Sequence, residues 1–114
     1  MKDDRIYLLH IRDAIHRIRD YTAAGKAAFL ADTKTQDAVV RNLEVIGEAA
    51  KSVSEQLKAT HESIPWKRVG GMRDKLIHEY FGVNLGIVWE VVEQELPVLE
   101  QKLRQILQQL GDKT

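Results

Sequence analysis

Residues 33–57 read TKTQDAVVRNLEVIGEAAKSVSEQL, and this stretch decides the fold. Its apolar side chains recur at steps of four and three residues, which is the spacing of one face of an α-helix. These side chains belong to Val39, Leu43, Ile46, Ala50, Val53 and Leu57. We predict one long helix that begins near Asp32 or Thr33, where Thr33 and Gln36 have the spacing of a capping box, and that ends near Leu57. The other helices would pack against it.

The opposite side of this helix is polar. It carries Arg41, Glu44, Glu48, Lys51 and Glu55, again at steps of three and four. Glu44 and Glu48 are one turn apart, and repulsion between their like charges lowers the stability of the helix by about 0.2–0.5 kcal/mol unless a cation pairs with both. Gly47 costs about 1 kcal/mol relative to alanine inside a helix, which suggests that another backbone comes close there. A solvated, salt-bridged face with one tolerated glycine is an equally open interpretation.

The N-terminal segment predicts a second helix, from about Asp3 to Ala24, with two different sides. Its apolar side is formed by Ile6, Leu8, Ile11, Ala14, Ile15, Ile18 and Tyr21. The basic stripe on the other side consists of Arg5, Arg12, His16 and Arg19. Such a stripe is either a solvated face or a track for phosphate groups, and the spacing leaves both open.

Residues 61–84 read HESIPWKRVGGMRDKLIHEYFGVN and contain several helix breakers. The breakers are Pro65, Gly70, Gly71, Gly82 and Asn84. The proline suits a first helical turn, and the double glycine would interrupt or kink the helix that follows. Gly82 predicts the end of that helix, and Asn84 predicts the cap of the next one. We therefore expect a short helix between breakers.

The last long stretch has one apolar face and an internal proline. Its apolar residues are Leu85, Val88, Val92, Leu96, Leu99, Leu103, Ile106 and Leu110. Pro97 cannot donate to the carbonyl of Glu93, so we expect a kink or break there. The prediction is an all-α protein, a four- to five-helix bundle formed by one domain over residues 1–114. The rich apolar faces and small total core make a homodimer plausible.

The composition narrows the possible functions. The 114 residues contain no cysteine, which suits a reducing compartment and excludes thiolate metal sites. The charged N-terminus and the lack of a long apolar run favour the cytoplasm over a membrane. Seventeen basic and seventeen acidic residues balance, so RNA would have to meet a local patch. No two of the four histidines stand four residues apart, and we predict no metal.

Residues 73–80 read RDKLIHEY and offer the best candidates for chemistry, Arg73, His78 and Tyr80. A histidine can take the proton of a ribose 2′-hydroxyl or protonate a leaving oxygen, and an arginine can hold charge on phosphate oxygens. On one regular helix, however, Arg73 and His78 lie about 140° apart. Either the double glycine distorts the helix, or two copies of the segment build the site across a dimer. A structural histidine on a helix is the plainer alternative.

Several segments together resemble a known family. They are RNLEVIGEAAK at 41–51, IPW at 64–66, GMRDKLIHEYFGV at 71–83, and the pairs VW at 88–89 and LP at 96–97. In this order they are similar to the HepT toxins of the HEPN superfamily, and the likeness covers nearly the whole chain. The resemblance implies a helical, usually homodimeric, metal-independent endoribonuclease with a catalytic arginine and histidine separated by four to six residues.

Arg73 and His78 match that catalytic pair, so the resemblance implies that the motifs of two protomers line one cleft. Asp74 stands where a polar residue, often asparagine, follows the family's arginine, and it departs from that pattern by its negative charge. Tyr80 matches the tyrosine to which the nucleotidyltransferase MntA is understood to transfer AMP, which silences the toxin. The implied partners are an MntA-like antitoxin and an RNA substrate, and no cofactor is implied.

The resemblance also implies a supporting or substrate-positioning role for Arg41, Glu44 and Glu48, which belong to the family's signature in this helix. We expect them to position Arg73 or to close the dimer, with Gly47 permitting the approach. An alternative function is a non-catalytic helical module that docks a nucleotidyltransferase or a nucleotide. The balanced net charge mildly favours this alternative.

Overall fold

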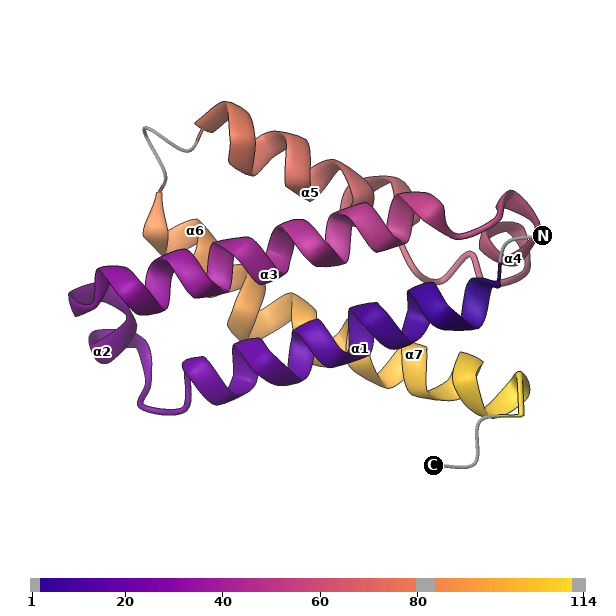
Figure 1. Ribbon diagram of the computed structural model, residues 1–114, viewed down its shortest axis with the longest axis horizontal. Helices are drawn as coiled ribbons and strands as arrows, with labels where there is room; N and C mark the ends of the chain where they lie inside the picture. Colours follow the sequence, from indigo (N-terminus) through magenta and orange to yellow (C-terminus); the bar gives the residue numbers. More distant parts are fainter. Residues whose placement is uncertain (1–2, 80–83, 112–114) are drawn as a thin grey trace.

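The computed structural model describes residues 3–79 and 84–111, with the side chains of all of these except residues 73–79. The described parts are helical apart from short connections (Figure 1). The elements in chain order are α1 (Asp4–Tyr21), α2 (Lys26–Ala31), α3 (Thr33–Ser52), α4 (Glu55–Thr60), α5 (Trp66–Glu79), α6 (Leu85–Glu90), the π-helix η2 (Val91–Glu95) and α7 (Leu96–Gln109). None of the helices in these ranges is both long and apolar enough to cross a membrane.

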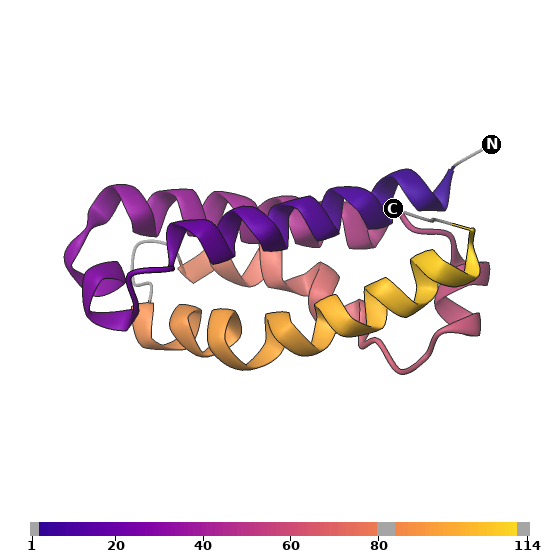
Figure 2. The ribbon, with the colours of Figure 1, turned by 90° about the horizontal axis from the view of Figure 1, so that it is seen from below.

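The long helices form a bundle around α3. In Figure 1, α3 lies between α1 and α5, and the run from α6 through η2 to α7 crosses behind α3 and α1. Figure 2 shows this run as a second layer that faces α1 and α3. The prediction of an all-α bundle is confirmed for the described residues, with α2 and α4 as short additions. One domain over residues 1–114 and a homodimer remain predictions.

The apolar face of α3 lies in the centre of the core. Its members Val39, Leu43, Ile46 and Ala50 are at most 1% exposed, and α1 contributes five buried residues from Leu8 to Ile18. Ile6 and Tyr21 are 49% and 42% exposed, so their assignment to the apolar face of α1 was wrong. At about 100° per residue, Ile6 lies roughly 140° from the centre of the buried face and Tyr21 near its edge.

The N-terminus of α3 lies where the sequence predicts it, but its cap differs. Asp32 is the N-cap, since its Oδ1 accepts from the Lys34 amide at 3.1 Å. The Thr35 hydroxyl also donates to Asp32, and this hydrogen bond holds the pKa of the carboxyl below its usual value. The Gln36 side chain donates instead to the carbonyls of Phe29 and Leu30, which end α2. The capping box of Thr33 and Gln36 was therefore a wrong expectation.

The expected continuous helix to Leu57 was also wrong, because α3 ends at Ser52 and α4 begins at Glu55. A polar cluster between α1 and this connection explains the break. The Asp4 carboxylate accepts from the Ser54 amide at 2.8 Å and from its hydroxyl at 2.5 Å. The Ser54 Oγ in turn accepts from the Leu57 amide at 3.2 Å and caps α4. Ser54 thus starts a new helix, while Val53 and Leu57 stay buried.

The double glycine does not interrupt α5, which runs as one α-helix from Trp66 to Glu79. The expected interruption at Gly70 and Gly71 was wrong. Pro65 precedes the helix, and its carbonyl accepts from the Val69 amide at 2.9 Å. The cap at Asn84 is confirmed, since its Oδ1 accepts from the first amides of α6. The stop predicted at Gly82 lies outside the described residues.

The irregularity expected around Pro97 is confirmed and takes the form of a π-helical segment. Pro97 lies in the first turn of α7, directly after η2. The Leu96 amide donates to the carbonyl of Val91, five residues earlier, as in a π-helix. The missing proline amide is accommodated by this wider turn, so the chain continues as a helix instead of breaking.

We predict that Ser54→Ala lowers the free energy of unfolding by about 1–2 kcal/mol, because the α4 cap and the bond to Asp4 are both lost. Urea denaturation followed by circular dichroism measures this change. Ser52→Ala is the matched control, since among the described residues the Ser52 hydroxyl bonds only the Glu48 carbonyl of its own helix. Equal effects of the two substitutions would contradict the assigned role of Ser54.

Candidate functional site

Helices α3 and α5 come close to one another at two glycines. Gly47 is buried in α3, and a β-carbon placed on Gly70 of α5 would lie 3.9 Å from the Gly47 carbonyl oxygen. The same β-carbon would lie 3.0 Å from Cγ of Lys51, so a larger residue at Gly70 would displace that side chain. The expectation that another backbone comes close to Gly47 is confirmed.

This contact sets the register between the polar side of α3 and the helix that carries Arg73. The two helices run in opposite directions in Figure 1. Moving one turn forward from Gly70 on α5 therefore corresponds to moving one turn back from Gly47 on α3, at about 1.5 Å per residue. The backbone of Arg73 thus lies across from the turn of α3 that contains Glu44.

The predicted site residues divide into two groups in the structure. Arg73, Asp74 and His78 lie on α5, and their side chains are outside the described part of the molecule. Tyr80 lies outside the described residues altogether. Arg41, Glu44 and Glu48 are described, and all three line one pocket of about 390 Å³. The structure therefore brings to one pocket the three residues of α3 that we expect to support the site.

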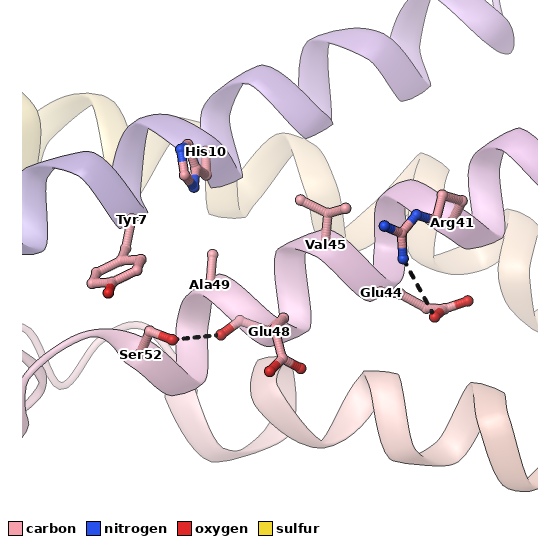
Figure 3. A pocket seen from close by; sticks show the side chains of 8 residues that line it. All are labelled: Tyr7, His10, Arg41, Glu44, Val45, Glu48, Ala49 and Ser52. Atoms are coloured by element: carbon pink, nitrogen blue, oxygen red, sulfur yellow. Dashed lines mark hydrogen bonds and ion pairs between the residues drawn. The ribbon is translucent and has the colours of Figure 1, made fainter.

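The pocket lies between α1 and α3 (Figure 3). Its lining residues are Tyr7 and His10 of α1 and Arg41, Glu44, Val45, Glu48, Ala49 and Ser52 of α3. The Arg41 Nη1 lies 4.0 Å from the Glu44 Oε2, a loose ion pair in which the arginine is 75% exposed and the glutamate 27%. In Figure 3 the Glu48 carboxylate points away from α1, toward the side on which α5 runs.

The sequence did not reveal the part that α1 plays in this pocket. The rings of Tyr7 and His10 meet edge to face, with centroids 6.4 Å apart and planes at 86°. The only signal in the sequence is that the two residues are three apart and so share one helix face. Which side of α3 that face meets depends on tertiary packing, and periodicity does not specify it.

Part of the basic stripe of α1 belongs to a structural ion cluster. Glu100 of α7 is 7% exposed, and its Oε2 lies 2.8 Å from His16 Nε2 while its Oε1 accepts from Arg19. Arg12 pairs with its neighbour Asp13 at 3.4 Å. At His16 and Arg19 the stripe joins α1 to α7. The structure therefore does not contain a continuous track for phosphate groups along the stripe.

The environment of Glu100 acts on its acidity in two opposing ways. Burial by itself raises the pKa of the carboxyl, but the hydrogen bonds and positive charges of Arg19 and His16 outweigh burial, and the net pKa lies below the usual value. The folded protein therefore favours the charged carboxylate. Within the described residues, no group of three or more histidine, aspartate or glutamate side chains could hold a metal ion.

Comparison with known proteins gives consistent matches along the chain. The family described as HepT-like, ribonuclease HepT-like, matches residues 11–106. A "Putative RNase" of Caldanaerobacter subterraneus subsp. tengcongensis is 44% identical over 109 residues, 95% of this chain and 97% of that protein. A "Probable ribonuclease HepT" of Thermococcus cleftensis is 44% identical over 101 residues, 88% of this chain and 92% of that protein.

A longer protein of Methanocaldococcus jannaschii, named "Gamma-glutamylcyclotransferase and putative RNase", is 42% identical over 110 residues. The match covers 96% of this chain and 50% of that protein, so the chain spans about half of its length. No solved structure matches the chain significantly.

We predict that Glu100→Gln lowers the free energy of unfolding at neutral pH by about 1–3 kcal/mol, because the charge-assisted bonds to Arg19 and His16 are weakened. The pKa of Glu100 is lower in the folded than in the unfolded chain, so its stabilisation is complete above about 4.5, the ordinary value, and disappears as pH falls through the folded pKa. Denaturation curves at a series of pH values should show wild type and variant converging in acid.

The control for this experiment is Glu62→Gln, which removes an exposed carboxylate. It should leave the free energy of unfolding within about 0.5 kcal/mol of the wild type at each pH. A gap between wild type and Glu100→Gln that stays constant into acid would contradict the ionic role of Glu100.

Proposed function

Because this chain belongs to the ribonuclease HepT-like family, we propose that it is a metal-independent endoribonuclease whose catalytic residues are Arg73 and His78. The observation that carries the proposal is the unbroken helix α5, which contains both residues and packs on the polar side of α3 at Gly70 and Gly47. The family match over residues 11–106 includes all of this helix and all of α3.

The continuity of α5 favours a site shared between two chains. Since α5 is an α-helix across Gly70 and Gly71, Arg73 and His78 start from backbone positions about 140° apart. The helix is not distorted at the glycines. Arg73 and His78 are therefore not brought together within one chain in that way. In the proposed homodimer, the arginine of one protomer and the histidine of its partner would act on the same phosphate.

The proposed reaction uses the nucleophile that RNA itself carries. His78 takes the proton of a ribose 2′-hydroxyl, the 2′-oxygen attacks the adjacent phosphorus, and the bond from phosphorus to the 5′-oxygen breaks. The leaving 5′-oxygen receives a proton from the protonated His78, directly or through water, and the products are a 2′,3′-cyclic phosphate and a 5′-hydroxyl. Arg73 would stabilise the charge that develops on the non-bridging phosphate oxygens through bidentate hydrogen bonds.

The polar residues of α3 would support this site in two ways. Glu48 points to the side on which α5 runs, and a carboxylate there would hold the guanidinium of Arg73 in place (Figure 3). Arg41 and Glu44 line the pocket between α1 and α3 and would position the substrate. Asp74, next to the catalytic arginine, would orient it rather than contact the phosphate, because its negative charge repels phosphate.

The proposal extends to regulation. The protein would be the toxin of a toxin–antitoxin pair, and an MntA-like nucleotidyltransferase would silence it by transferring AMP to Tyr80. The transfer joins the tyrosine oxygen to the α-phosphorus of ATP and releases pyrophosphate. A bulky anionic adenylate two residues from His78 would block the RNA path and repel its phosphates.

We predict that His78→Ala reduces the rate of RNA cleavage by about 10²–10⁴-fold, because the proton-transfer group is lost. The measurement is cleavage of a labelled RNA with detection of 2′,3′-cyclic phosphate ends, in the presence of a chelator. His61→Ala, which removes a histidine from the connection after α4, should cleave like the wild type. Size-exclusion chromatography of both variants checks that the oligomeric state is unchanged.

Equal cleavage by the wild type and His78→Ala would remove His78 from the catalytic pair. If no RNA is cut by the pure wild type, but a stable complex forms with a nucleotidyltransferase, the non-catalytic binding module is the better description.

We predict that incubation with an MntA-like enzyme and ATP adds the mass of one or more AMP groups to the protein and abolishes RNA cleavage. Intact-protein mass spectrometry measures the addition. Tyr80→Phe should gain no AMP and should remain active when treated in the same way, while Tyr21→Phe, which changes an exposed tyrosine at the end of α1, should behave like the wild type. An AMP adduct on Tyr80→Phe would exclude Tyr80 as the sole acceptor.

A further inference from the structure

Gly71 is a glycine inside α5 that the packing of the described residues does not require. We infer that the outward side of α5, with Gly71 and Lys67, is the path along which the RNA strand reaches His78. The ribose–phosphate backbone would lie against Gly71, and Lys67 would contact a phosphate a few nucleotides from the cleaved bond. The inference rests on the proposed function for the role of His78, but its test is a binding measurement that does not depend on cleavage.

The two neighbouring glycines of α5 differ in their surroundings. A β-carbon on Gly70 would lie 3.0 Å from Cγ of Lys51, so packing on α3 accounts for that glycine. A β-carbon on Gly71 would meet no described atom within 4 Å, and α5 is an α-helix at this position. Glycine costs about 1 kcal/mol relative to alanine inside a helix. Close approach to a ligand is one established use of glycine, and neither a turn nor internal packing accounts for this one.

The helical repeat places Gly71 and Lys67 on the same side of α5 as His78. At about 100° per residue, the backbone positions of Gly71 and Lys67 lie about 20° to either side of that of His78. At about 1.5 Å per residue, Gly71 lies about 10 Å and Lys67 about 16 Å from it along the helix axis. Arg73 lies about 160° around the helix from Gly71, at a position near the buried Val69. The outward side of α5 thus leads from Lys67 to the proposed proton-transfer residue.

The charge of Lys67 is available to a phosphate group. Lys67 is exposed, and no described residue forms an ion pair with it. Two neighbouring cations differ in this respect, because Lys58 pairs with Glu55 at 3.6 Å and Arg68 pairs with Glu95 at 2.8 Å. Binding of RNA replaces counterions around phosphates by basic side chains of the protein. Lys67 can take this part without the loss of an existing ion pair.

Two acidic residues border the path. By the same helical repeat, Asp74 lies about 60° from Gly71, toward the face of α5 that packs on α3. Glu62 is exposed in the connection that precedes α5, before the turn that carries Lys67. Carboxylates at these positions repel phosphates. The strand would therefore follow the edge of Gly71, away from α3, and would leave the helix before it reaches Glu62.

The residue types on this side fit an RNA strand better than a second copy of the chain. Positions 67, 71, 74 and 78 are lysine, glycine, aspartate and histidine, and none of them is apolar. The buried centre of a homodimer interface is mainly apolar. Proteins that bind single strands instead follow the backbone with basic groups, and RNA adds 2′-hydroxyls that bond polar side chains.

The test measures binding of a labelled single-stranded RNA of mixed sequence to the full chain carrying His78→Ala, which slows cleavage. Fluorescence anisotropy gives the dissociation constant. Gly71→Leu in this chain should weaken binding at least about ten-fold, because the added side chain occupies the path of the strand. Its melting temperature should not fall, since the β-carbon meets no described atom and leucine is a better helix former than glycine. Ala27→Leu, at an exposed position of α2, is the matched control and should bind like the parent chain.

Lys67→Gln tests the phosphate contact through the salt dependence of binding. The slope of log K against log salt concentration should become shallower by about 0.7, the contribution of one phosphate contact with a single strand. Lys26→Gln, which removes an exposed lysine at the beginning of α2, is the control and should keep the slope of the parent chain.

Unchanged binding by Gly71→Leu, or an unchanged slope in Lys67→Gln, would overturn the inference, as would no binding of the RNA by the parent chain. Loss of a dimer in Gly71→Leu on size-exclusion chromatography, with the slope of Lys67→Gln unchanged, would assign this side of α5 to a second copy instead. Cleavage by the wild type separates the result from the proposed function. If the wild type cuts no RNA although both variants weaken binding, the strand path stands and the ribonuclease is rejected. If the wild type cuts RNA and both variants bind and cut like it, the ribonuclease stands and the strand path is rejected.

Discussion

The close contact between α3 and α5 at Gly47 and Gly70 is the constraint on which the arrangement of the site depends. Without side chains at these two positions, the helices approach closely enough that a β-carbon on Gly70 would meet Lys51 and the Gly47 carbonyl. A buried glycine inside a helix costs about 1 kcal/mol, and a position that tolerates this cost usually has a packing reason. Here the reason is register, because the contact aligns the turn of Glu44 with that of Arg73.

Two polar contacts hold α1 to distant parts of the chain and complement the apolar core. Near the beginning of α1, Asp4 bonds the amide and hydroxyl of Ser54, which separates α3 from α4. Further along α1, His16 and Arg19 bond the buried Glu100 of α7. Directional bonds of this kind restrict sliding of helices whose apolar faces alone would tolerate several registers. They also explain why much of the charge on α1 has a structural role.

The helical periodicity of the sequence predicted most elements, and two of the failures have a tertiary cause. The interior of α3, the cap at Asn84 and the irregularity around Pro97 follow from local spacing and backbone chemistry. The break at Ser54 could not be predicted in this way, since its partner Asp4 is fifty residues away. Likewise, the double glycine permits a kink but does not impose one, and packing against α3 keeps α5 helical.

By itself, the sequence determined the helical class, the apolar faces, the grouping of Arg41, Glu44 and Glu48 on one side of a helix, and the divergence of Arg73 and His78 around another. These properties depend on the 3.6-residue repeat, which acts along a single chain segment. Only the tertiary structure decided that Tyr7 and His10 complete a pocket with that polar side, and that Glu100 takes up part of the basic stripe. Such pairings join residues far apart in sequence, and packing of side chains in three dimensions selects them.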